Sequence, residues 1–100
     1  MKIYLDDIRP APEGWELYTQ AEDVIVMLLE RPDRIDALSL DNDLGAGNLE
    51  GVYVAKMVCA LALSGFIREI PLEAHTQNGP ARCRMVDYFS AAQKAWKEQD

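Results

Sequence analysis

The sequence is poor in the residues that most metal and redox sites require. Its 100 residues include two cysteines and a single histidine, which are too few for a structural zinc site. Cys59 and Cys83 lie far apart in apolar segments, and no Cys-x-x-Cys pair occurs. We therefore expect two small buried thiols in a reducing cytoplasm.

Positive charge is also scarce. Ten Lys and Arg residues against 17 Asp and Glu residues give a net charge of −7 at pH 7. A chain with this charge repels a phosphate backbone, so the composition argues against bulk nucleic-acid binding and against attraction to a membrane surface. A single phosphate group can still bind where a metal ion or a local arginine reverses the field.

Long apolar runs are absent from the sequence. The longest nearly apolar run, residues 57–63, is too short to span a bilayer. Asp6 and Asp7 interrupt the N-terminal segment before the apolar region of a signal peptide could form. We expect a cytoplasmic protein with one domain over residues 1–100.

Short apolar runs alternate with amphipathic segments along the chain. Strands are predicted near residues 2–5, 15–18, 35–40 and 67–74, and helices near 21–31, 52–64 and from 80 onward. A capping box from Thr19 to Glu22 starts the first helix, and Pro32 closes it. This alternation predicts an α/β fold with a parallel sheet covered on both faces.

Acidic residues follow two of the predicted strands where each one ends. In a parallel sheet these ends share one edge, and ligands bind there. The carboxylates are Asp6, Asp7, Asp41 and Asp43. Together they repel one another unless protonated or bridged by a cation, and such oxygen ligands suit Mg²⁺, with Mn²⁺ as a substitute. The alternative is that these aspartates cap helices or solvate loops.

Four further residues near this edge are candidates for substrate chemistry. His75, the single histidine, follows a strand, where it could exchange a proton or make only a structural hydrogen bond. Arg9 and Arg82 could clamp a phosphate, although Arg9 could equally pair with a nearby aspartate and Arg82 could point into solvent. Asn78 could orient a phosphate oxygen or cap the helix that begins near Pro80.

An acidic pair after the first strand and an aspartate after a later one resemble the receiver domain of response regulators. By that analogy Asp6 and Asp7 bind Mg²⁺, and Asp41 stands at the phosphoryl-acceptor position. The chain departs from the receiver pattern, because a proline-rich loop replaces the first helix and no fifth strand with its lysine follows.

Three segments resemble a smaller group, the cyclic-phosphate processing receiver domains. They are the opening Ile3 to Pro12, the central Ser39 to Gly45, and the run from His75 through Asn78 and Arg82 to Met85. The resemblance implies a minimal receiver-like, flavodoxin-like three-layer sandwich of about four mostly parallel strands and three helices. Asn42 stands where this family usually has histidine.

The resemblance also implies a function. It is metal-dependent hydrolysis of a phosphoester, most concretely of RNA 2′,3′-cyclic phosphate ends or cyclic nucleotides. Asp41, His75 and Arg9 would be catalytic, and Arg9, Asn78 and Arg82 would bind the substrate. The expected partner is a small phosphorylated ligand or an RNA terminus, with a protein partner also open. The alternative is a degenerate receiver, encoded by a phage or mobile element, that serves as a non-catalytic signalling, nucleotide-binding or protein-binding module.

Overall fold

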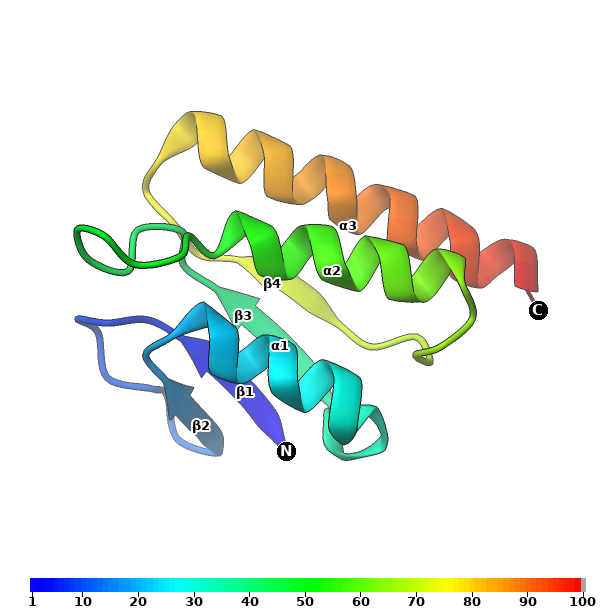
Figure 1. The fold of residues 1–100 in the computed structure, drawn as a ribbon, viewed down its shortest axis with the longest axis horizontal. Coiled ribbons are helices and arrows are strands. Elements are labelled where there is room, and N and C mark those ends of the chain that lie inside the picture. The colour runs from blue at the N-terminus through cyan, green and yellow to red at the C-terminus, as the bar shows by residue number, and fades with distance from the viewer. Residues whose placement is uncertain (100) are drawn as a thin grey trace.

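Four short parallel strands form one sheet in the computed structural model, which describes residues 1–99 (Figure 1). The strands are β1 (Lys2–Leu5), β2 (Trp15–Tyr18), β3 (Ala37–Leu40) and β4 (Leu72–Ala74). They lie in the order β2-β1-β3-β4, and every neighbouring pair is parallel. The predicted number and direction of strands are confirmed, although β3 and β4 are shorter than the sequence pattern suggests.

Three helices and one short 3-10 turn complete the chain. They are α1 (Ala21–Glu30), η1 (Pro32–Arg34), α2 (Val52–Leu63) and α3 (Gly79–Gln99). Within residues 1–99, no helix is both long and apolar enough to cross a membrane. The predicted capping box is wrong, because α1 is capped by Gln20 and the cap side chain makes no hydrogen bond.

All three helices lie on one face of the sheet (Figure 1). The crossovers β2-α1-β3 and β3-α2-β4 step in the same direction across the sheet. Because such crossovers are right-handed, both place their helix on the same side. Helix α3 then packs beside α2 on that side. The α/β class with a parallel sheet and three helices is therefore confirmed.

The number of layers differs from the predicted three-layer sandwich. No helix covers the second face of the sheet in residues 1–99, so the described chain has one layer of strands and one of helices. On this second face Lys2 and Leu17 are exposed, and Tyr4 and Trp15 are half-buried. The physical reason is the loop between β1 and β2, which contains Pro10 and Pro12 and replaces the helix that would cover this face.

The apolar core lies between the sheet and the helices. Alternate side chains of β1 and β3, namely Ile3, Leu5, Leu38 and Leu40, are at most 1% exposed and point toward the helices. They form one cluster with the buried faces of α1, α2 and α3. This packing fixes the strand ends, where the polar loops begin.

The two cysteines are both free thiols but differ in their surroundings. Cys59 is buried on α2, as expected, whereas Cys83 is exposed on α3. The prediction of two buried thiols is therefore wrong for Cys83. The buried stripe of α3 instead follows Met85 and Phe89, so position 83 falls on its outer side.

Candidate functional site

The candidate site begins with a row of residues on the second face of the sheet, the open face that no described helix covers. The row takes one residue from each of three neighbouring strands, which are paired in register: Tyr4, Ser39 and Glu73. Because strand side chains alternate between faces, the residues two positions further along continue the same face. Those residues are Asp6, Asp41 and His75.

Asp6, Asp41 and His75 form a compact cluster beyond the strand ends. One ligand atom from each, a carboxylate oxygen or an imidazole nitrogen, lies within 4.8 Å of the other two. Two anionic oxygens and a ring nitrogen fit a divalent cation such as Mn²⁺ or Mg²⁺, with the carboxylates as the ligands that Mg²⁺ prefers. The structure thus brings together three of the predicted site residues from three different loops.

Asp6 is the buried centre of this cluster, with 1% of its surface exposed. Its Oδ1 accepts the backbone N–H groups of Ile8 and Arg9, both at 2.9 Å. Its Oδ2 lies 3.0 Å from the Arg9 guanidinium and 3.0 Å from His75 Nε2. Burial acts to raise the pKa of Asp6, but these amide, imidazole and guanidinium hydrogen bonds outweigh it and hold the pKa below its usual value.

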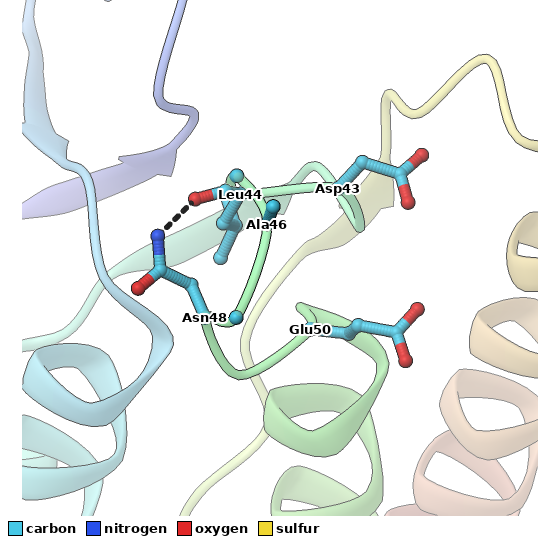
Figure 2. Close-up of a pocket in the computed structure, with 7 residues that line it drawn as sticks. Asp43, Leu44, Ala46, Asn48 and Glu50 are labelled. Carbon is cyan, nitrogen blue, oxygen red and sulfur yellow. Dashed lines mark hydrogen bonds between the residues drawn. The ribbon is translucent and has the colours of Figure 1, made fainter.

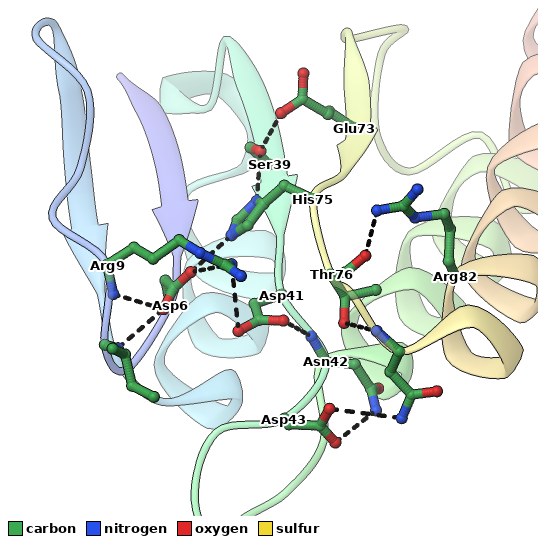
Figure 3. Close-up of polar contacts among 12 residues, drawn as sticks. Asp6, Arg9, Ser39, Asp41, Asn42, Asp43, Glu73, His75, Thr76 and Arg82 are labelled. Atoms are coloured by element: carbon green, nitrogen blue, oxygen red, sulfur yellow. Dashed lines mark hydrogen bonds and ion pairs between the residues drawn. The ribbon is translucent and has the colours of Figure 1, made fainter.

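Arg9 places a positive charge over both carboxylates. Its guanidinium is 3.0 Å from Asp6 and 3.9 Å from Asp41 (Figure 3). The Arg9 side chain is 39% exposed, so solvent reaches it from the open side. An exposed guanidinium beside a carboxylate pair can turn toward an incoming phosphate while an ion takes over the carboxylates.

His75 is held on three sides. Its Nδ1 lies 2.8 Å from Ser39 Oγ, its Nε2 lies 3.0 Å from Asp6, and its ring stacks on Tyr4 with 4.2 Å between ring centroids. Ser39 Oγ also donates to Glu73 at 2.7 Å. Burial, followed by the charge of nearby Asp6, raises the pKa of Tyr4, so this ring stays neutral beside the imidazole.

Asp41 and Asn42 have different orientations although they are adjacent. Asp41 Oδ1 accepts the backbone N–H of Asn42 at 2.8 Å, while its Oδ2 faces Arg9. The fully buried Asn42 side chain points away from the cluster (Figure 3). It accepts the N–H of Val52 at 3.0 Å and donates to Glu50 at 2.9 Å. Position 42 therefore anchors the start of α2 in this chain rather than contributing to the Asp6–Asp41–His75 cluster.

Asp7 and Asp43 are not brought into the cluster. Both are exposed, and among residues 1–99 the compact group of ligand atoms contains neither. Asp7 lies near Gly45, since its Oδ2 is 3.7 Å from where a Cβ on Gly45 would stand. Asp43 faces the amide nitrogens of Asn42 and Asn78, at 3.4 and 3.5 Å.

The loop after Asp43 surrounds an open hollow of about 440 Å³ (Figure 2). Asn48 Nδ2 donates to the Leu44 carbonyl at 2.7 Å and closes the loop. Asp43 and Glu50 line the hollow, whereas Asp6 and His75 do not. The hollow therefore lies beside the carboxylate–imidazole cluster rather than at it.

Asn78 and Arg82 lie at the start of α3. Asn78 Oδ1 accepts the N–H of Ala81 at 3.1 Å, which is the capping role that the sequence left open, and its Nδ2 remains directed at Asp43. The Arg82 guanidinium donates to the carbonyl of Thr76, on the loop that carries His75 (Figure 3). Both residues thus border the site while also holding its loop in place.

Ser39, Glu73 and Tyr4 were missed by reasoning from the sequence. Each stands two residues before a predicted site residue, on the same face of its strand. That spacing of two is visible in the sequence, but the register that aligns the three strands is not. Without that register, Ser39 and Glu73 are not distinguished from ordinary polar residues of short strands.

Comparison with known proteins gives one family match. A family model described as "Cyclic-phosphate processing Receiver domain" matches residues 1–91. No curated protein and no solved structure matches the chain.

Proposed function

The chain belongs to the cyclic-phosphate processing receiver domain family, and from that premise we propose that it hydrolyses a cyclic phosphodiester with the help of a divalent cation. The proposed substrates are RNA 2′,3′-cyclic phosphate ends or cyclic nucleotides, and the proposed location is the cytoplasm. The net charge of −7 favours a small phosphorylated ligand or a chain terminus over a long phosphate backbone.

One observation carries this proposal. Asp6, Asp41 and His75 present their ligand atoms within 4.8 Å of one another at the carboxyl edge of the sheet, with the Arg9 guanidinium beside them. Two carboxylates that lie this close are stable when a positive charge neutralises them. The guanidinium of Arg9 supplies that charge here, and a cation held by the carboxylates would free Arg9 for the substrate.

The reaction requires a water oxygen to attack phosphorus, one P–O bond of the ring to break, and the departing oxygen to receive a proton. A divalent cation on the carboxylates would activate water and neutralise phosphoryl oxygens. In our proposal Asp41 holds the ion, the Nε2–H of His75 gives its proton to the departing 2′ or 3′ oxygen, and the attacking water returns a proton to Nε2. Arg9 stabilises the negative charge that develops on the phosphoryl group.

The remaining predicted residues have supporting roles in the proposal. Asn78 and Arg82 bind the substrate from the start of α3, where the helix amides also favour an anion. Asp7 and Asp43 are exposed, so we propose that they reach the ion through water molecules, which Mg²⁺ tends to retain.

The test is hydrolysis of a 2′,3′-cyclic mononucleotide with Mg²⁺, with Mn²⁺ and with a chelator. The expected result is release of a 2′- or 3′-nucleotide with either metal, no release with the chelator, and none from Asp41→Ala. Asp23→Ala, which removes an exposed carboxylate from α1, is the matched control and keeps full activity. Cyclic-nucleotide binding without turnover would contradict hydrolysis and favour a non-catalytic binding module.

A further inference from the structure

The polar contacts on the open face of the sheet continue beyond the predicted site residues. Glu73, Ser39, His75 and Asp6 form an unbroken chain of contacts across three strands, at 2.7, 2.8 and 3.0 Å in turn (Figure 3). Ser39 is 1% exposed, so its hydroxyl is not open to a substrate. The Ser39 hydroxyl can therefore affect the reaction only through the residues that it contacts, Glu73 and His75.

The number of available protons fixes the direction of these hydrogen bonds. A serine hydroxyl has one proton, and a carboxylate can only accept. Because Ser39 donates its proton to Glu73, its oxygen is free only to accept, and His75 Nδ1 must be the donor. By the same rule the Asp6 carboxylate can only accept, so the other ring nitrogen donates its Nε2–H to Asp6 Oδ2 and faces the cluster.

We propose that Ser39 and Glu73 are positioning residues that hold His75 with Nδ1–H on Ser39 and Nε2 directed into the site. This inference rests on the proposed function, in which the Nε2–H of His75 donates a proton to the departing oxygen. Outer partners of this kind orient imidazoles in metal sites, where losing one lowers metal affinity or activity by about 10- to 100-fold, and we expect a loss of kcat of that order here. Tyr4 completes the arrangement, because its ring lies parallel to the imidazole at an angle of 3°.

The single histidine of the chain makes this proposal directly measurable. A long-range ¹H–¹⁵N correlation spectrum at fixed pH contains one set of imidazole signals, all from His75. The expected wild-type spectrum shows a proton on Nδ1 that is protected from exchange with water. In Ser39→Ala this protected signal is lost, and Ser39→Thr, which keeps the hydroxyl, restores it.

Kinetics provide the second readout. Ser39→Ala and Glu73→Ala are expected to lower kcat for the cyclic nucleotide by about 10- to 100-fold with little change in KM or in metal binding. Glu73 is exposed, so Glu73→Ala removes the acceptor of the Ser39 hydroxyl without removing buried packing. Glu69→Ala, at an exposed glutamate shortly before β4, is the matched control and leaves kcat unchanged.

Two results would overturn the inference. One is a protected Nδ1–H signal that persists in Ser39→Ala. The other is a kcat in Ser39→Ala and Glu73→Ala that stays as high as in the Glu69→Ala control. If the wild-type protein hydrolyses no cyclic phosphate, the proposed function fails, while the spectrum still decides whether Ser39 and Glu73 orient the ring.

Discussion

Gly51, immediately before α2, packs against the backbone that carries Asp41. A Cβ added at this position would stand 1.8 Å from the Asp41 carbonyl oxygen and 3.2 Å from Asn42 Cα. The φ of Gly51 is −62°, which any residue adopts, so the effect of Gly51→Ala is purely steric. The alanine fits only if the end of β3 moves away from α2 by more than 1 Å.

The expected cost of Gly51→Ala has two parts. Overpacking at a buried position costs about 1–3 kcal/mol of unfolding free energy. For a domain of this size that lowers Tm by about 4–24 °C, measured by circular dichroism. Moving Asp41 by about 1 Å is expected to lower kcat for the cyclic nucleotide by about 100-fold.

Gly79→Ala is the matched control for this change. An added Cβ at Gly79, the first residue of α3, has no atom within 4 Å other than those of its chain neighbours Asn78 and Pro80. We therefore expect Gly79→Ala to lower Tm and kcat far less than Gly51→Ala does. If Gly51→Ala melts and turns over substrate like the wild-type protein, the close packing of Gly51 beneath Asp41 is refuted.

Three further predictions concern the rest of the fold. The pKa of Asp6 is lowered on folding, so its ionised form stabilises the protein above about pH 4, and this stabilisation is lost as the pH falls through the lower folded pKa. The difference in Tm between the wild-type protein and Asp6→Asn should therefore shrink on acidification. A difference that stays constant would contradict this. Asn42→Ala should cost about 1–3 kcal/mol in urea denaturation, because it leaves buried hydrogen-bonding groups without partners, and an unchanged midpoint would refute its anchoring role. Met85→Ala should lower the free energy of unfolding by about 2–5 kcal/mol in the same assay, because Met85 is fully buried. Val86, its neighbour in the sequence, is exposed, so Val86→Ala should change that free energy by no more than about 0.5 kcal/mol. Equal losses in the two variants would contradict the assigned burial.

Much of the fold was predictable because the strands and helices carry strong local patterns. Apolar runs that end in acidic residues locate the carboxyl ends of β1 and β3, and the rule that parallel strand ends meet brings Asp6, Asp41 and His75 together. Only the chain order and the strand direction are needed for that inference.

The details that escaped prediction depend on the relation between segments distant in sequence. The contact between Ser39 and Glu73 requires the register of β3 against β4. The sequence pattern favours a sheet covered on both faces, whereas the open face follows from a prolyl loop that supplies no helix. Asp6 and Asp7 are neighbours, yet only Asp6 enters the cluster, because successive residues leave a strand on opposite sides.

The most direct test of the central claim is a thermal melt with and without millimolar Mn²⁺ or Mg²⁺, on the wild-type protein and on Asp41→Asn. A cation that binds only the folded chain stabilises it by about 1.4 kcal/mol at ten times its Kd, which raises Tm by several degrees. We predict this rise for the wild-type protein and its loss in Asp41→Asn, while Asp23→Asn keeps it. No rise in the wild-type protein, or an equal rise in Asp41→Asn, would contradict a metal site built on the carboxylates of Asp6 and Asp41.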